Sequence, residues 1–222
     1  MTGEAWQIVW FTVRISALST LIILPFGIAI AWLIARHDWP GKTVVETAVM
    51  LPLFVPPVAT GLLLLMLFGR NGPLGSLLNR FGLDIIFTWR AVTVACAVMS
   101  FPLLVRTAQT AFEEVNRRLE EIARTLGASE WRVLRTITLP LASRGIVAGA
   151  VLAFARAMGE FGATAVVAGI IPGKTMTISL SIYQHIQLGQ DTAALPLLFF
   201  SIAIVFVTVL CGQIISRRKP SR

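Results

Sequence analysis

Long, uninterrupted apolar stretches dominate this sequence, and several of them run for twenty or more residues. A helix needs about 20 apolar residues to cross the hydrocarbon core of a bilayer. Because a chain in lipid must satisfy its backbone hydrogen bonds internally, only helices and closed barrels can span a membrane. The apolar residues here are continuous and do not alternate with polar ones, so the sequence predicts helices. Hydrophobic residues make up 56% of the chain and charged residues 14%, whereas soluble domains carry about 45–50% and about 25%.

The expected fold is an all-α membrane protein of about five transmembrane helices in a single domain, residues 1–222. We expect spans at about 6–35, 43–68, 91–111, 145–170 and 193–215, with a hydrophilic segment at 112–144. The N-terminus lacks a basic region and a small-residue cleavage site, so the first stretch is expected to stay as a helix. Three prolines, Pro52, Pro56 and Pro57, indicate either a plain kink in the second span or a helix broken beside a transport pathway. Residues 176–188 are expected to form a short helix, either re-entrant or on the surface.

Basic residues predict the orientation, because cytoplasmic loops of membrane proteins collect lysine and arginine. With five spans, the 36–42 loop, the 112–144 segment and the C-terminus share one side of the membrane. Thirteen of the nineteen basic residues lie on that side: Arg36, Lys42, Arg106, Arg117, Arg118, Arg124, Arg132, Arg135, Arg144, Arg217, Arg218, Lys219 and Arg222. We therefore expect the N-terminus outside and the C-terminus in the cytoplasm.

The net charge of +8 follows from this loop asymmetry and does not indicate nucleic-acid binding. Such binding needs a basic patch interleaved with stacking aromatic residues, and the sequence shows none. Cys96 and Cys211 lie in apolar stretches and are expected to be small buried side chains, with neither a disulfide nor a metal site. His37 and His185 are isolated from each other and from any acid or cysteine cluster, so no metal, cofactor or catalytic site is expected.

The 112–144 segment predicts two short amphipathic helices. Apolar residues recur there at steps of four, three and four, which places them on one helix face: Val115, Leu119, Ile122 and Leu126. On the polar side, Glu120 is expected to pair with Arg124 one turn away.

The ends of these two helices also have sequence signals. Gly127 is expected to end the first helix, because it tolerates a left-handed backbone. Ser129 is expected to cap the second helix, with Glu130 in its first turn. Leu139 and Pro140 are expected to stop that helix before the next span.

This segment resembles the coupling loop of ABC importer permeases. The family pattern is Glu-Ala-Ala, three residues, Gly, nine residues, Ile, one residue, Leu-Pro. The residues that match it in this spacing are Glu121, Ala123, Gly127, Ile137, Leu139 and Pro140. Ile122 replaces the first alanine, a change that keeps the helix. The resemblance implies that the loop docks into a cleft of a cytoplasmic ABC ATPase subunit and passes nucleotide-driven motion to the membrane helices.

The resemblance extends over nearly the whole chain to permeases of molybdate ABC importers, within a molybdate, tungstate and sulfate group. It is carried by Phe26-Gly27, residues 39–42, 51–57, 100–103 and 154–164. It implies a homodimer in the bacterial inner membrane, in contact with lipid, bound to two ATPase subunits and supplied by a periplasmic oxyanion-binding protein. Sulfate and tungstate are the alternative substrates. The chain itself is then no enzyme, since ATP hydrolysis belongs to its partner.

An ion-coupled secondary transporter is the alternative from another class. It predicts coupling carboxylates at the membrane midplane and often inverted repeats. Only Glu160 qualifies, next to a neutralising Arg156, and the sequence shows no repeat. These two charges lie one turn apart within the fourth span, where an unpaired charge costs about 2.5–3.5 kcal/mol. They either line the oxyanion pathway or form a structural ion pair.

Two further patterns have competing interpretations. A small residue recurs at every fourth position, which allows a close approach of another helix, within the subunit or across a dimer: Gly145, Gly149, Ala153 and Ala157. Gly173-Lys174-Thr175, with Ala168 at P-loop spacing, is similar to a nucleotide-binding motif. It lacks the leading glycine and follows a membrane helix in place of a buried strand, so we reject a nucleotide site there.

Overall fold

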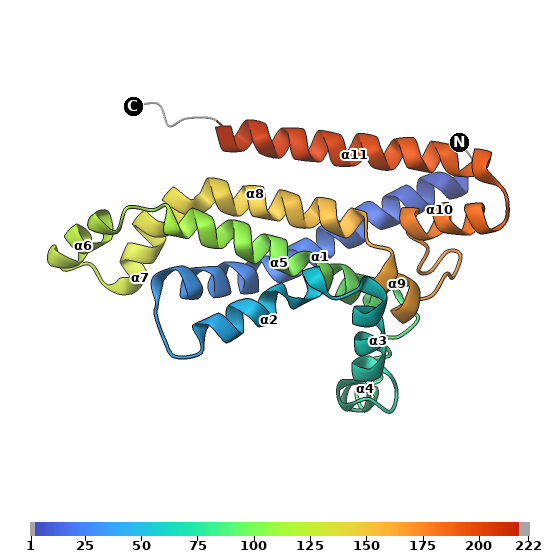
Figure 1. Cartoon of the computed structure of the whole chain (residues 1–222), viewed down its shortest axis with the longest axis horizontal. Coiled ribbons are helices and arrows are strands. Elements are labelled where there is room, and N and C mark those ends of the chain that lie inside the picture. The colour runs from blue at the N-terminus through green and yellow to red at the C-terminus, as the bar shows by residue number, and fades with distance from the viewer. Residues whose placement is uncertain (1–2, 218–222) are drawn as a thin grey trace.

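The computed structural model describes residues 3–217, with side chains for residues 3–214, and consists there of helices and connecting turns (Figure 1). Four helical segments are long and apolar enough to cross a membrane: α1 (Gly3–Arg36), α5 (Trp89–Glu113), the continuous run Glu130–Met158, and α11 (Asp191–Arg217). A bent pair of shorter helices makes a fifth if it is counted as one span. The all-α membrane fold with four to five spans is thus confirmed. Of the C-terminal basic residues, Arg218, Lys219 and Arg222 lie outside the described residues.

The bundle is built on α5, which packs against α1 on one side and against α8 (Leu139–Met158) on another (Figure 1). Small residues allow the close approach between α5 and α8. A side chain at Gly145 would collide with Ala111, and one at Gly149 would press on the Leu104 carbonyl at 3.2 Å. The stripe of small residues therefore serves packing within the subunit, the first of its two interpretations.

The predicted second span is two helices, α2 (Lys42–Phe54) and α3 (Pro57–Phe68), which meet at an angle of 111°. A proline disfavours the helical conformation of the residue before it. Val55 precedes Pro56 and has ψ 136°, and Pro56 precedes Pro57 and has ψ 130°. Two consecutive residues are thus extended, and α3 leaves the bundle sideways together with α4 (Pro73–Asn79) (Figure 1). The prolines break the helix, which is more than a kink.

The predicted fourth span, 145–170, has different boundaries in the structure. Its helix ends at Met158, the chain turns through Gly159 to Phe161, and a short helix α9 (Gly162–Val167) follows. Helix α9 packs against α3, and a Cβ atom on Gly162 would lie 2.7 Å from the Pro57 Cβ atom. The two helix breaks therefore lie against each other.

Pro140 does not stop the helix before this span, contrary to the sequence-based expectation. Helix α7 (Glu130–Val133) continues through a π-helical turn, η1 (Leu134–Thr138), directly into α8. In an α-helix the proline ring would clash with the carbonyl four residues earlier. In the wider turn Leu139 donates its N–H to the Leu134 carbonyl, five residues back, so the helix accommodates Pro140. The helical run is continuous from Glu130 to Met158, although α7 is inclined to α8 (Figure 1), and we call this run the rod.

The segment 176–188 contains α10 (Ile178–Gln187), which packs against α1 and α11 at the end of the molecule where the chain begins. The Thr12 hydroxyl accepts a hydrogen bond from the Ile178 N–H at 2.9 Å. Both cysteines are free, and Cys96 is buried as expected, but Cys211 is exposed on α11. Its burial was wrongly predicted because an apolar stretch does not show which face is covered.

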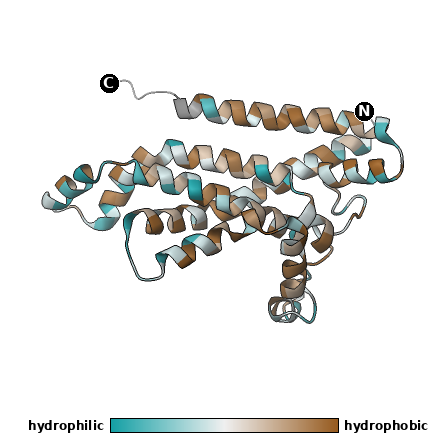
Figure 2. Ribbon diagram, viewed as in Figure 1, coloured by the Kyte–Doolittle hydropathy of each residue, from teal (hydrophilic) through white to brown (hydrophobic). Residues whose placement is uncertain are grey.

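The opposite end of the molecule carries the 36–42 loop and the predicted coupling segment, where α6 (Arg117–Thr125) and α7 project beyond the bundle (Figure 1). Hydrophilic residues gather in these two regions, while α3 and α11 are mostly hydrophobic (Figure 2).

Candidate functional site

The predicted coupling segment folds as two short helices joined by a tight turn. The Asn116 side chain caps α6 by accepting a hydrogen bond from the Arg118 N–H at 3.0 Å. Ser129 occupies the N-cap position of α7 as predicted, although its side chain accepts no capping hydrogen bond. The two helices and their order follow the sequence-based expectation.

Gly127 ends α6 in the left-handed conformation, with φ 84°, as predicted. The Gly127 N–H donates to the Arg124 carbonyl at 2.9 Å, and the Ala128 N–H donates to the Ala123 carbonyl at 3.0 Å. This pair of hydrogen bonds is a Schellman motif. Two residues of the matched pattern belong to this motif: Ala123 supplies one of its two accepting carbonyls, and Gly127 is its left-handed residue.

Glu120 is buried and connects three elements, although the sequence placed it on the polar face of α6. Its Oε1 atom lies 2.9 Å from Arg36 Nη2 at the end of α1, and it accepts a hydrogen bond from the Thr138 hydroxyl of η1 at 2.7 Å. Arg36 also donates to the Val115 carbonyl at 3.1 Å, and Arg117 donates to the Ala35 carbonyl at 3.4 Å. The coupling segment is therefore fixed to both α1 and the rod that enters α8.

Arg124 pairs mainly with Glu130 and only weakly with Glu120, from which it is 4.0 Å away. Arg124 Nε and Nη2 donate to the two Glu130 carboxylate oxygens at 2.6 and 3.0 Å. These hydrogen bonds lower the pKa of Glu130 below its ordinary value and raise that of Arg124. The stabilisation from Glu130 is present above its ordinary pKa and is lost as the pH falls through the lowered value. At neutral pH this ion pair closes the turn between α6 and α7.

A set of large apolar side chains on α6 and α7 is exposed. Leu126 is 82% exposed, Trp131 64% and Ile122 56%, with Leu119 close behind. Of the predicted apolar face only Val115 is buried. Isolated exposed apolar residues are ordinary, but four large ones on two adjoining short helices indicate an interaction surface. We call Leu119, Ile122, Leu126 and Trp131 the apolar surface of the coupling segment.

The remaining residues of the matched pattern lie around this surface. Glu121 is exposed and lines a cavity of about 160 Å³ together with Arg36 and Glu120. Ile137 and Leu139 are half-buried on the rod, where Leu139 packs against the α1–α5–α8 core, and Pro140 is exposed in the first turn of α8.

Arg156 and Glu160 lie at the break between α8 and α9, at the opposite end of the rod. Arg156 Nη1 is 2.8 Å from Glu160 Oε2, and the Glu160 carboxylate is almost fully buried. Its other oxygen accepts the Ala163 N–H at 2.8 Å, which caps the start of α9. The ion pair therefore joins the two helices across the break, where α9 packs against α3.

Replacing Arg156 with alanine is expected to destabilise this break, because it leaves the buried Glu160 carboxylate without its cation. The loss is expected to be about 1–3 kcal/mol and to lower the melting temperature of the purified protein. The Arg156→Lys variant keeps the charge and is the matched control. If Arg156→Ala folds normally and leaves substrate uptake unchanged, these residues have no role in a transport pathway.

Sequence reasoning missed the parts of this site that depend on tertiary structure. No local pattern links Arg36, Glu120 and Thr138, which come from three separate segments. The only signal was a basic residue in the last turn of α1, where it also suits the helix dipole. Within residues 3–217 no group of histidine, cysteine and carboxylate side chains is arranged to hold a metal ion.

Known transport permeases are similar to this chain over most of its length. A family model described as "binding-protein-dependent transport system inner membrane component" matches residues 23–219. The chain is 46% identical to the molybdenum transport system permease protein ModB of Escherichia coli strain K12, over 100% of this chain and 98% of that one. It is 36% identical to the sulfate transport system permease protein CysW of the same strain, over 90% of this chain and 70% of that one.

A chain of the MetNI methionine ABC transporter shares the fold. It has a TM-score of 0.77 and 20% identity, with 98% of each chain covered. Membership of such a transport system implies a binding protein and an ATPase as partners, and it makes the chain a non-catalytic, multi-pass subunit. This chain belongs to the family of inner-membrane components of binding-protein-dependent ABC transport systems.

Proposed function

We propose that two copies of this chain form the membrane pathway of a molybdate ABC importer, driven by ATP hydrolysis on two cytoplasmic ATPase subunits. A periplasmic oxyanion-binding protein delivers the substrate. The observation that carries this proposal is the apolar surface of the coupling segment. Its helices α6 and α7 project beyond the bundle (Figure 1), and Glu120 fixes α6 to α1 and to the rod. The N-terminus then lies in the periplasm and the C-terminus in the cytoplasm, in agreement with the distribution of basic residues.

The apolar surface has the chemistry of a docking element. An exposed tryptophan and leucine cluster is what the buried centre of a protein interface requires, since large apolar and aromatic residues dominate binding energy there. Leu126 and Trp131 flank the turn that Gly127 and the Arg124–Glu130 pair hold closed. The surface therefore reaches an ATPase cleft as a preformed shape, with little conformational entropy to lose on binding.

The rod from Glu130 to Met158 supplies a direct connection from this surface to the membrane interior. It begins within the docking element, and Glu120 connects its π-turn to α6 and α1. It ends at the break held by Arg156 and Glu160, where α9 packs against α3. Broken helices that meet within a bundle are typical of transport sites, because they bring backbone groups to the pathway.

The substrate assignment rests on similarity over the whole chain. The molybdenum permease is 46% identical and is matched over 98% of its length, whereas the sulfate permease is 36% identical and is matched over 70% of its length. Sulfate and tungstate remain the alternatives, because all three are tetrahedral dianions of the same charge. An ion-coupled transporter would work without an ATPase, which separates that class experimentally.

Uptake of radiolabelled molybdate tests the proposal. Cells that lack their own permease receive this chain together with its ATPase and binding protein, and excess unlabelled sulfate or tungstate is added as a competitor. We expect uptake that resists sulfate and stops when the ATPase is omitted. A Gly127→Pro variant is expected to abolish uptake, because proline fixes φ near −65° where the turn needs 84°.

Each alternative has its own outcome. Uptake that sulfate or tungstate suppresses more strongly than unlabelled molybdate reassigns the substrate. Full uptake without the ATPase overturns the ABC mechanism itself. Full uptake by the Gly127→Pro variant, at normal expression, contradicts coupling through this turn.

A further inference from the structure

A cavity of about 870 Å³ lies between the N-terminal half of α1, the start of α5 and the loop around Lys174. Three cations line it, Arg14, Arg90 and Lys174, each from a different segment, and no Asp or Glu among the described residues lines it. Three like charges around one cavity repel one another unless an anion lies between them. The coupling segment, α6 and α7, lies at the other end of the molecule from the N-terminal half of α1, which lines this cavity (Figure 1).

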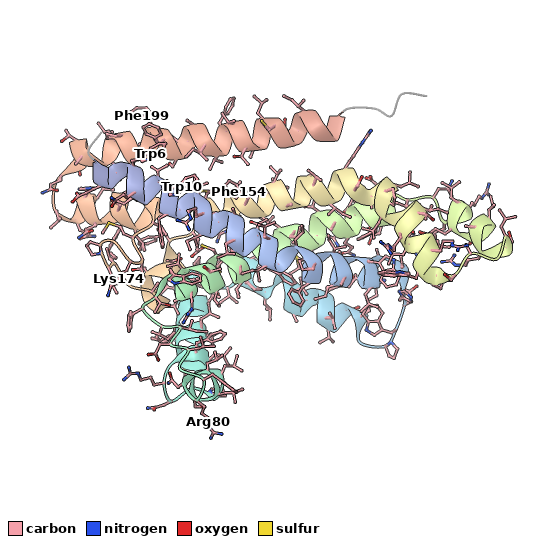
Figure 3. All side chains as sticks on the ribbon, turned by 180° about the vertical axis from the view of Figure 1, so that it is seen from behind. Trp6, Trp10, Arg80, Phe154, Lys174 and Phe199 are labelled. Carbon is pink, nitrogen blue, oxygen red and sulfur yellow. The ribbon has the colours of Figure 1, made fainter. Side chains whose placement is uncertain are left out.

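The cavity also has an apolar part along α1. Arg14 continues the exposed stripe that begins with Trp6 and Trp10, and Leu18 and Leu21 extend it toward the middle of the helix. Figure 3 shows Trp6 and Trp10 on the N-terminal half of this helix. Tryptophan marks the membrane–water interface, and exposed leucine the hydrocarbon region. Arg14 lies between these zones, where its long side chain can reach the headgroup level.

Hydrogen bonds to the backbone hold the Arg90 side chain and the loop that carries Lys174. The buried Thr175 hydroxyl accepts the Ile171 N–H at 3.1 Å and donates to the Gly169 carbonyl at 2.9 Å, which closes the loop that presents Lys174. Arg90 donates to the Asp84 carbonyl at 3.2 Å and lies over the Trp89 ring at 5.5 Å. Lys174 and Thr175 belong to the P-loop-like sequence rejected above, and the structure shows what they do: the threonine closes a turn and the lysine faces the cavity.

We propose that an anionic phospholipid binds in this cavity, with its phosphate between Arg14, Arg90 and Lys174 and an acyl chain along Leu18 and Leu21 of α1. A free oxyanion would use the cations but leave the apolar wall unoccupied. A phospholipid matches both the cations and the apolar wall, because its phosphate would lie at Arg14 and its acyl chain along Leu18 and Leu21 further down the helix. The inference requires only that α1 and α5 span the membrane, and it is independent of the transported substrate.

Native mass spectrometry of the purified transporter tests this inference. The complex is titrated with phosphatidylglycerol or with phosphatidylethanolamine of the same acyl chains, and the affinity of the first bound lipid is measured. Each basic residue near a membrane surface contributes about 1 kcal/mol, or about 5-fold in affinity. We expect Lys174→Gln to weaken phosphatidylglycerol binding about 5-fold, and the Arg14→Gln, Arg90→Gln, Lys174→Gln triple variant at least 25-fold. Phosphatidylethanolamine binding is expected to be weak and unchanged.

Arg80 supplies the matched control. It is an exposed basic residue at the tip of the α3–α4 arm, away from Lys174 (Figure 3). Arg80→Gln removes one positive charge, as Lys174→Gln does, and is expected to leave lipid binding unchanged. Lys174→Arg keeps the positive charge and is expected to keep lipid binding. Lys174 is exposed on a loop, so its single variants remain informative if the triple variant does not fold.

Three results would overturn the proposal. One is equal binding of phosphatidylglycerol to the Lys174→Gln and Arg80→Gln variants. Another is displacement of the lipid by millimolar inorganic phosphate, which identifies a site for soluble anions. The third is the absence of any preference for the anionic lipid in the wild-type transporter, as expected if a second copy of the chain covers the cavity.

Discussion

The Glu120→Ala variant is expected to lose both stability and transport, and its loss of stability is expected to be the largest of any single substitution at the coupling segment. Removing one partner of a buried ion pair leaves an uncompensated charge and costs about 3–5 kcal/mol. Here both side chains are less than 10% exposed, and Arg36 Nε and Nη1 already lack partners among the described residues. Thr138 loses its acceptor as well. The melting temperature of the purified complex and molybdate uptake are the measurements.

Two further variants separate this effect from a general loss of charge. Glu114→Ala removes an exposed carboxylate from the same segment, and it is expected to change neither quantity. The double variant Arg36→Met, Glu120→Leu removes both buried charges and is expected to recover most of the stability, because an apolar replacement of a buried pair is often neutral. It is not expected to recover uptake, since the connection between α6, α1 and the rod is gone. A Glu120→Ala variant as stable as Glu114→Ala contradicts the role given to this network.

The Leu126→Asp variant is expected to lose the ATPase subunit while the permease itself stays folded. Leu126 is 82% exposed, so a charge there is solvated in the isolated chain but would be buried on docking. Truncating or charging a central interface residue costs 2 kcal/mol or more, which corresponds to at least about 30-fold in affinity. Copurification of the ATPase and the affinity of the purified subunits for each other provide the measurement.

Phe81→Asp is the control for this substitution. Phe81 is 73% exposed and follows α4, on the arm that leaves the bundle, far from the coupling segment (Figure 1). The Phe81→Asp substitution introduces the same negative charge at a similarly exposed apolar position, and it is expected to leave ATPase binding unchanged. If the Leu126→Asp and Ile122→Asp variants both bind the ATPase normally, the apolar surface of the coupling segment is excluded as the docking element.

The sequence predicted those features that depend on neighbouring residues. Long apolar stretches were enough to predict the membrane helices, since lipid leaves a backbone few alternatives. Gly127 was correctly predicted to be left-handed, because a glycine after an amphipathic run has few other uses. The helix–turn–helix of residues 117–133 follows from the same local signals.

The features that the sequence did not predict depend on how neighbouring elements respond. Pro56 and Pro57 break their helix completely because each forces the preceding residue into an extended conformation. Pro140, by contrast, interrupts nothing, because the turn before it widens to a π-helix. The presence of a proline in the sequence therefore does not show whether a helix breaks or continues. The burial of Glu120 was equally hidden, since it depends on Arg36 at the end of another helix.

The α8 part of the rod has a mechanical consequence that follows from its length. The 20 residues of α8, at a rise of 1.5 Å each, make a lever arm of about 30 Å. A tilt of only about 5° at the cytoplasmic end of α8 therefore displaces its other end by roughly 2–3 Å. That end adjoins α9, where Gly162 packs so closely against Pro57 that not even a Cβ atom fits between them. A small rotation of the docked segment must accordingly push α3 and α9 apart or carry them along, without any change within the helix that transmits it.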